Sequence, residues 1–320
     1  MNKPKIIFMG TPHIAMVALD ALCQKYDVCL VVSQPDKEKD RKGNYVYSEV
    51  KQYCLTHNLH LVQPTKVKEA LNQIQELNPD LIVTCAYGQF IPSSILSTPK
   101  YKCVNLHASL LPRWRGAAPM QWAILSGDKK TGLTLMYMDK LMDHGNIIAT
   151  IDIPLVPLKT NYSTLYALME EAVIEMINTK FDELFSDHVI SYVQDESLVT
   201  LAPMITKEQL VIDWDQPGTS IINHINAFAN EPLAITYLND WQFKVAQAIF
   251  DPNANVNQSI ANGTIITCDK QQLVVKVKDG TIAILQIQPQ NKKMLPIKAF
   301  LNGNNLIHVN DQFKKNKSEI

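Results

Sequence analysis

The amino-terminal half of the sequence alternates between strand patterns and helix patterns, and this alternation restricts the chain to few folds. Apolar runs at residues 5–9 and 28–33 predict two buried strands, and residues 11–25 predict a helix entered through Thr11 and Pro12. Sequential units of this kind build a parallel sheet with right-handed crossovers. The alternation continues in helix patterns at 48–58 and 66–77 and strand patterns at 59–62, 80–85 and 102–106. We therefore expect an α/β fold with a Rossmann-like parallel sheet.

The turn after the first strand reads GTPHIA, at residues 10–15. It lacks the GxGxxG run that brings the amino terminus of a helix against a pyrophosphate. A dinucleotide cofactor is therefore not expected, despite the Rossmann-like opening.

The last third of the chain changes character near residue 207. A helix pattern at 218–229 precedes short strand patterns at 242–248, 263–267, 273–277 and 282–286, and turn residues such as Asp279 and Gly280 separate them. A small β-barrel of the OB type fits these strands. A chain of 320 residues is also too long for one ordinary small domain. We expect a first domain over residues 1–189, a linker over 190–206 and a second domain over 207–320.

A long helix is predicted over residues 163–185, followed by a link at 187–201 where the helical period breaks. The residues expected on its buried side are Leu165, Leu168, Met169, Ala172, Ile174 and Met176.

The stretch CVNLHASLLPRWRGAAP, residues 103–119, carries the strongest signal of a functional site. Asn105 and His107 share one face of the predicted strand because side chains alternate with a period of two. Pro112, Gly116 and Pro119 interrupt any further strand, so the rest of the stretch is expected to be a loop. In an open α/β sheet this rim is where ligands bind.

Asp143, in the segment MDKLMDHGN, is the expected partner of His107. It follows a second strand pattern at 132–138, and a third at 146–154 is expected to pair with that strand. A single histidine is more often an ordinary structural side chain than a catalyst. An imidazole, a carboxylate that sets its tautomer and an amide donor such as Asn105 are together what acyl transfer requires.

Charge and cysteine usage narrow the class of protein further. A net charge of -1 argues against nucleic-acid binding by bulk electrostatics, so any such contact must come from local basic clusters. The only arginines are Arg41, Arg113 and Arg115, and arginine suits planar contacts to carboxylates or phosphates. The six cysteines have no regular spacing, which is typical of reduced thiols in a cytoplasmic protein.

Neither a metal nor a membrane is expected. Cys54, His57 and His60 could be considered as metal ligands, but only the first two share a helix face and a fourth ligand is missing. The start of the chain has too short an apolar run for a signal peptide, and nowhere are there 18 uninterrupted apolar residues.

The stretch NLHASLLPRWRGAAP followed by MDKLMDHG closely resembles the formyltransferase family that uses 10-formyltetrahydrofolate. Other segments resemble that family in the same order along nearly the whole chain. They are IIFMGTPHIA, VSQPDK, PDLIVTCAYGQFIP, LAPMITKEQLVIDW and GTIITCDKQQLVVKVKDG. Such collinear similarity is more specific than any single motif.

The resemblance implies a catalytic set and a folate site. The implied catalytic residues are Asn105, His107 and Asp143, and the formyl donor and co-substrate is 10-formyltetrahydrofolate. The pterin ring is expected to bind main-chain groups of residues 86–92 and 138–144 beside an apolar wall. The cofactor-binding candidates are Ala86, Tyr87, Phe90, Ile91, Ser109, Leu110, Leu111, Pro112 and Met138.

The resemblance also implies that the formyl acceptor is the α-amino group of methionine on initiator methionyl-tRNA. The tRNA-binding candidates are Arg41, Lys42, Arg113, Arg115, Lys244, Lys292 and Lys293, and Lys276 and Lys278 are further candidates for phosphate contacts. We expect a monomer in the cytoplasm.

Three departures from the family pattern affect how substrates are recognised. The family often has phenylalanine at the position of Ile14, its pattern is altered at residues 40–49, and an Asn-Pro-Trp-Pro run is replaced by residues 229–232. Alternatives also remain open within and outside the family. The same three catalytic residues serve enzymes that formylate amino sugars or hydrolyse the folate, and a noncatalytic RNA-binding folate sensor is a further hypothesis.

Overall fold

The chain forms two compact units. The computed structural model describes residues 3–36, 43, 45–186, 188–230, 232–303 and 305–316. The first unit comprises Met1–Pro119, Lys130–Pro154 and Ala167–Pro203, and the second comprises Met120–Lys129, Leu155–Tyr166 and Met204–Ile320. The main division after Pro203 lies inside the linker expected at 190–206, and the exact domain boundaries stay a proposal.

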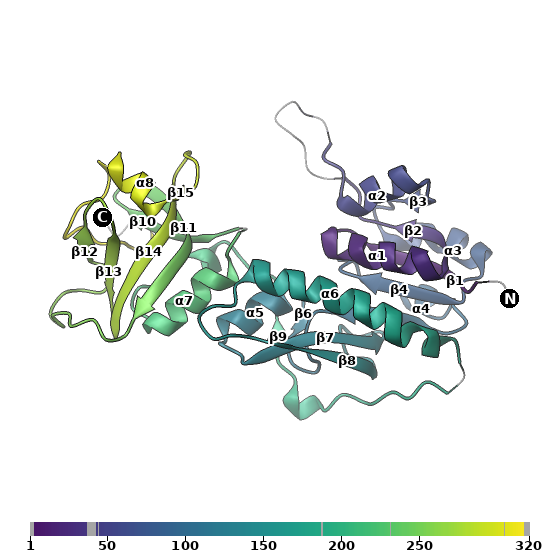
Figure 1. Cartoon of the computed structure of the whole chain (residues 1–320). Helices are drawn as coiled ribbons and strands as arrows, with labels where there is room; N and C mark the ends of the chain where they lie inside the picture. Colours follow the sequence, from purple (N-terminus) through teal and green to yellow (C-terminus); the bar gives the residue numbers. More distant parts are fainter. Residues whose placement is uncertain are drawn as a thin grey trace. The chain divides into compact units, whose positions relative to one another are not determined.

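The first unit is built on a seven-stranded sheet with strand order β3-β2-β1-β4-β5-β7-β8 (Figure 1). β1 to β5 are parallel, whereas β7 runs antiparallel to β5 and β8 antiparallel to β7. The expected α/β fold with a parallel sheet is therefore confirmed. The strands are β1 (Lys5–Gly10), β2 (Asp27–Val32), β3 (Leu61–Val62), β4 (Leu81–Cys85), β5 (Cys103–His107), β7 (Lys130–Tyr137) and β8 (Ile147–Pro154).

Helices cover both faces of this sheet because its strands are apolar on both sides. The helix α1 (His13–Lys25) packs against β1, β2 and β4, as Figure 1 shows. On the other face, Ile7 and Met9 of β1 join a buried cluster with Ile74 and Ile95. The remaining helices of the first unit are α2 (Glu49–His57), η1 (Val67–Ala70), α3 (Leu71–Leu77), α4 (Ser93–Leu96), η2 (Phe181–Phe185) and η3 (Glu196–Leu198). The helix α5 (Pro119–Leu125) lies almost wholly in the second unit, and α6 (Tyr162–Lys180) begins in the second unit and continues in the first.

The helix expected at 163–185 is confirmed in position but differs in its end and its buried side. It is α-helical only to Lys180, and a 3-10 turn follows. Leu168 and Ile174 are 39% and 42% exposed, so their expected burial is wrong. The buried face includes Val173 and Ile177 instead, because successive residues of an α-helix turn by about 100° and place these two beside Leu165, Met169 and Met176.

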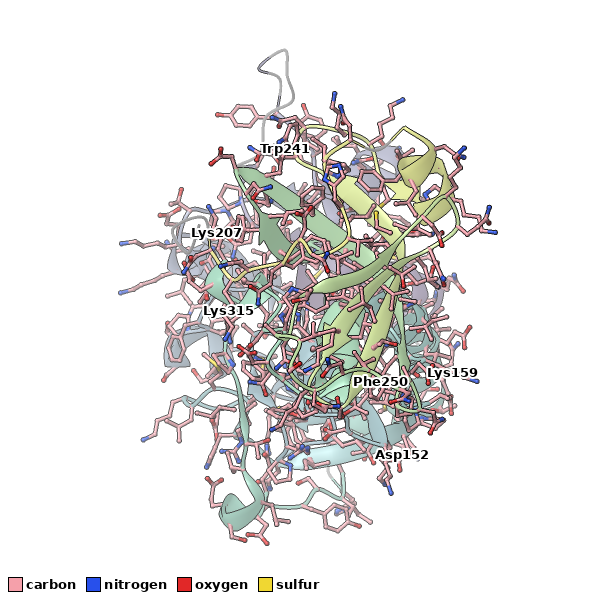
Figure 2. All side chains as sticks on the ribbon, turned by 90° about the vertical axis from the view of Figure 1, so that its left-hand side faces the viewer. Asp152, Lys159, Lys207, Trp241, Phe250 and Lys315 are labelled. Atoms are coloured by element: carbon pink, nitrogen blue, oxygen red, sulfur yellow. The ribbon has the colours of Figure 1, made fainter. Side chains whose placement is uncertain are left out.

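The second unit contains an antiparallel sheet with strand order β10-β11-β14-β13-β12, and β15 pairs with β14. Trp241 and Phe250, labelled in Figure 2, lie near the two ends of β11. The elements are η4 (Glu208–Leu210), α7 (Gly218–Ala227), β10 (Ala234–Leu238), β11 (Trp241–Asp251), β12 (Ile265–Cys268), β13 (Leu273–Val277), β14 (Gly280–Pro289), β15 (Leu295–Pro296) and α8 (Ile297–Asn302).

The carboxyl-terminal segment links the two outer strands of this sheet. Lys314 exchanges two backbone hydrogen bonds with Tyr237 of β10, and Phe313 donates to the carbonyl of Gly263 just before β12. Phe313 also stacks on Trp214 and packs edge-on against the buried Phe243. The sheet therefore curls into the small β-barrel expected from the strand patterns.

The two units also hold six cysteines, all of them free thiols. Two short β-strands of the first unit, β6 (Arg115–Gly116) and β9 (Leu201–Ala202), pair in parallel outside the main sheet.

We expect the buried thiols to resist alkylation in the native protein. Burial raises the pKa of Cys85 and of Cys103 to about 12, and the pKa of Cys54 to about 11. Only the thiolate is nucleophilic, so these residues are almost wholly unreactive at pH 8. As long as the pH stays below the pKa, each increase of one pH unit should raise the labelling rate about tenfold. Mass spectrometry after iodoacetamide treatment measures this. Protein unfolded in urea is the control, and labelling of native Cys103 at the unfolded rate would contradict the prediction.

Candidate active site

The site lies at the carboxyl ends of β1, β4 and β5, where the strand order reverses between β1 and β4. Gly10 ends β1 at a very close approach of two backbones. A Cβ atom there would lie 2.6 Å from Cβ of Ala15 and 2.8 Å from the carbonyl oxygen of Cys85. The turn at this edge therefore needs glycine because of packing, although it lacks a dinucleotide motif.

Asn105 lies on β5 with its amide oriented by the neighbouring strand. Thr84 of β4 pairs with Asn105 in the parallel register, and its hydroxyl donates to Oδ1 of Asn105 at 2.7 Å. Because Oδ1 is engaged by this bond, the NH₂ group of Asn105 is directed away from β4. Asn105 is half-buried, so this donor can reach a ligand at the sheet edge.

His107 is buried and anchored through one ring nitrogen. Its Nε2 lies 2.9 Å from the carbonyl oxygen of Trp114, and a carbonyl can only accept, so Nε2 carries the hydrogen. Trp114 has a φ of 65°, a left-handed conformation that is costly for a bulky residue and that turns its carbonyl toward His107. The nitrogen left for proton exchange is therefore Nδ1.

Asp143 is the carboxylate that faces this nitrogen. Its Oδ2 lies 3.7 Å from Nδ1 of His107 and accepts a hydrogen bond from the backbone N–H of Gly116 at 2.9 Å. The distance of 3.7 Å is longer than a hydrogen bond but within the range of an ion pair. The structure thus brings together all three predicted catalytic residues, two from β5 and one from the loop after β7.

The loop after His107 is tied to β7. The hydroxyl of Thr134 donates to the carbonyl of Ser109 at 2.6 Å and accepts from the N–H of Leu111 at 3.1 Å. The hydroxyl of Ser109 donates within the loop to the carbonyl of Arg113 at 2.6 Å. Ser109 is fully buried, so its side chain holds the loop, and Leu110 and Pro112 are the more accessible of the candidates here.

The folate candidates after β4 and β7 fall into two groups. Ala86 and Phe90 are exposed, Phe90 to 67%, whereas Tyr87 and Ile91 are buried in the core beneath them. Met138 packs against the same core and its sulfur lies 3.2 Å from the hydroxyl of Thr84. Burial raises the pKa of Tyr87 to about 12, so its hydroxyl stays neutral. The thioether of Met138, close to Asn105 through Thr84, and the exposed ring of Phe90 are apolar groups of the kind that cover a flat heterocycle.

The arginines of the site loop occupy different environments. Arg113 is exposed and its guanidinium lies 4.3 Å from the ring centroid of Trp114. Arg115 is only 8% exposed, and it bonds Gln194 and Glu196. The guanidinium of Arg115 is thus buried and bonded within the protein. Of the two arginines, Arg113 is the one exposed to solvent. Arg41 and Lys42 lie outside the described residues.

In the second unit, three of the predicted lysines lie around one strand pair. Lys244 of β11 pairs with Gln288 of β14, and the amide of Gln288 donates to the carbonyl of Lys292 at 2.7 Å. Lys292 and Lys293 are exposed in the turn before β15. Lys276 is 4% exposed and bonds Asn262 at 2.7 Å, so it is not available for phosphate.

Four groups that build this site were not predicted from the sequence. They are the hydroxyl of Thr84, the carbonyl of Trp114, the N–H of Gly116 and the amide of Gln194. The strand pattern located Thr84 at the end of a buried strand, but only the pairing of β4 with β5 identifies its partner. No local pattern singles out Gln194, which lies in the expected linker.

Among the residues that the structure describes, no group of three or more histidine, cysteine, aspartate or glutamate side chains is arranged to hold a metal ion. In the same part of the chain, none of the helices combines the length and apolarity that crossing a membrane would need.

The fold and this site define an α/β protein with the groups for acyl transfer, and comparison with known proteins narrows the class. The model of the formyl transferase family matches residues 4–179, and the model of the formyl transferase C-terminal domain matches residues 204–305. The chain belongs to the formyl transferase family.

Its curated relatives carry a more specific name. A protein of Ureaplasma parvum serovar 3 named methionyl-tRNA formyltransferase is 44% identical over 305 residues, covering 95% of this chain and 98% of the relative. A protein of the same name from Malacoplasma penetrans is 39% identical, covering 96% of each chain.

Solved structures share the fold at low sequence identity. A sugar 3N-formyl transferase, WlaRD, has a TM-score of 0.66 at 20% identity and covers 92% of this chain and all of its own. HypX from Aquifex aeolicus, solved in complex with tetrahydrofolic acid, has a TM-score of 0.62 at 15% identity and covers 95% of this chain and 47% of its own.

Proposed function

We propose that the protein transfers a formyl group from 10-formyltetrahydrofolate to the α-amino group of methionine on initiator methionyl-tRNA. The single observation that carries this proposal is similarity along nearly the whole chain to proteins named methionyl-tRNA formyltransferase. The meeting of Asn105, His107 and Asp143 at the sheet edge supports it.

In the proposed mechanism, the amine nitrogen attacks the formyl carbon and the carbonyl electrons move onto oxygen. The NH₂ group of Asn105 donates to this developing oxyanion, because Thr84 already engages its Oδ1. Collapse of the tetrahedral intermediate re-forms the carbonyl and breaks the bond to N10 of the folate, and N10 takes a proton.

His107 and Asp143 are proposed to handle the protons. With Nε2 held by Trp114, Nδ1 is the nitrogen that can take a proton from the attacking amine or return one. Asp143 at 3.7 Å favours the charged form of the ring during that transfer.

The folate is proposed to lie against Phe90, Met138 and the backbone at Ala86, with the formyl group toward Asn105. Edge-on hydrogen bonds to main-chain groups would fix the pterin ring, and the apolar side chains would cover its face. This site would be assembled from the loops that follow β4 and β7.

The test is whether labelled formyl moves from 10-formyltetrahydrofolate to methionyl-tRNA on incubation with purified protein. Acid-stable label on the aminoacyl-tRNA supports the proposal. Two parallel reactions, one with a nucleotide-linked amino sugar and one with no acceptor, test the sugar formyltransferase and hydrolase alternatives. Transfer to the sugar alone, or release of formate alone, would contradict the proposed acceptor.

Arg113 is the proposed phosphate contact of the site loop. Replacing Arg113 with alanine should weaken tRNA binding and lower the slope of log K against log salt by about one. Filter binding across a salt series measures this. The matched control is Lys130→Ala, which removes an exposed cation already paired with Asp152. An unchanged slope for Arg113→Ala would contradict the contact.

We also propose that the protein works as a monomer in the cytoplasm. Six free thiols are typical of a reducing compartment. Light scattering on the purified protein measures the oligomeric state, and a stable dimer would contradict this part.

A further inference from the structure

The backbone of Asp143 is in a conformation that its local sequence does not favour. Its φ is 50°, in the left-handed region that aspartate visits only occasionally. A backbone in this region is stabilised when contacts from elsewhere in the fold hold it.

Gln194 supplies such a contact. Its side-chain NH₂ donates to the carbonyl of Asp143 at 2.9 Å and to the carbonyl of Gly145 at 2.8 Å. Gln194 is 5% exposed, so both bonds are shielded from water. The two carbonyls lie on either side of His144, and one amide therefore fixes the loop immediately before and after this residue.

Arg115 fixes the orientation of that amide. Its Nε and Nη2 donate to Oε1 of Gln194 at 3.0 and 2.8 Å, and its Nη2 also bonds Glu196 at 2.7 Å. This bond to Arg115 lowers the pKa of Glu196, which stays ionised and keeps the guanidinium in place. Because a guanidinium has only donors, the amide cannot flip. Its two N–H groups must face the loop that carries Asp143.

The pairing of β6 with β9 also positions the side chain of Asp143. β6 and β9 lie side by side (Figure 1), and Arg115 pairs with Leu201 and Gly116 with Ala202. This pairing places Gly116, whose N–H donates to Oδ2 of Asp143. A Cβ atom at Gly116 would lie 2.5 Å from the carbonyl oxygen of Ala202, so the contact requires glycine.

We propose that Gln194, locked by Arg115, is a positioning residue that aims the Asp143 carboxylate at His107. This inference rests on the proposed function and assigns a catalytic purpose to a segment expected to be a linker. Gln194 reaches Asp143 only through the backbone carbonyl and does not touch His107 by any hydrogen bond described for it. We therefore expect its effect on the reaction to pass through Asp143.

The test is a double-mutant cycle of Gln194→Met with Asp143→Asn, measured by single-turnover formyl transfer to methionyl-tRNA. Gln194→Met alone should slow transfer by about 10- to 100-fold, since displacing a reacting group by about 1 Å costs up to that much. In the Asp143→Asn background it should add almost nothing, because groups that act as a unit are not additive. Equal losses in both backgrounds would mean a general structural role and would overturn the inference.

Gln194→Glu is the second variant, in case the Gln194→Met protein does not fold. It keeps the size and the acceptor for Arg115 but removes both donors to the loop, so it should also slow transfer. The matched control is Gln312→Met, which removes a 2.8 Å bond from a glutamine amide to the carbonyl of Asn262 in the second unit. Wild-type rates in folded Gln194→Glu would overturn the inference, whereas no transfer by the wild type would instead contradict the proposed function.

Discussion

Replacing Asp143 with asparagine is expected to slow single-turnover formyl transfer by about 10²- to 10⁴-fold, the usual contribution of positioned acid–base groups. Asparagine has the same shape and can still accept the hydrogen bond from Gly116. The negative charge facing Nδ1 of His107 at 3.7 Å is lost, so the charged ring formed during proton transfer has no counter-ion. Rapid-quench measurement with labelled 10-formyltetrahydrofolate gives the rate.

Asp152→Asn is the matched control for this prediction. Asp152 lies on β8, and its carboxylate accepts a hydrogen bond from Lys130 at 2.7 Å and does not bond His107. We expect it to retain most of the activity. A rate for Asp143→Asn close to that of wild type, in protein with an unchanged circular dichroism spectrum, would remove Asp143 from the mechanism.

Asn105→Ala is expected to slow transfer by about 10²- to 10³-fold, the cost of removing one donor to a developing oxyanion. The physical reason is that its NH₂ group is already oriented by the bond from Thr84 to Oδ1 and needs no rearrangement during the reaction. The loss should fall mainly on the chemical step, with a much smaller change in the KM for tRNA.

Asn105→Asp removes the N–H donor without changing how the side chain packs. Aspartate keeps the shape of the side chain and the acceptor for Thr84, yet it has no N–H and places a negative charge where the oxyanion forms. It should therefore be at least as slow as alanine. If both variants transfer formyl at wild-type rates, the oxyanion role of Asn105 is wrong.

Much of the fold of the first unit could be predicted from local sequence patterns. Alternating strand and helix signals predicted the parallel sheet, and the period of two along β5 placed Asn105 and His107 on one face. The glycine and proline pattern after His107 predicted a loop at the sheet edge. Where local patterns failed, as at Leu168 and Ile174, the apolar residues lie off the buried face of a helix whose orientation is set by packing.

The sequence by itself determined which elements form and which reactive side chains stand at the sheet edge, because hydrophobic periodicity and turn residues act over a few neighbouring positions. Only the tertiary structure decided what orients those side chains. Thr84 reaches Asn105 across the β4–β5 register, and Gln194 reaches Asp143 from 51 positions away in the chain. Such bonds depend on how distant segments pack, and a single polar residue in an irregular segment carries no local mark of its partner.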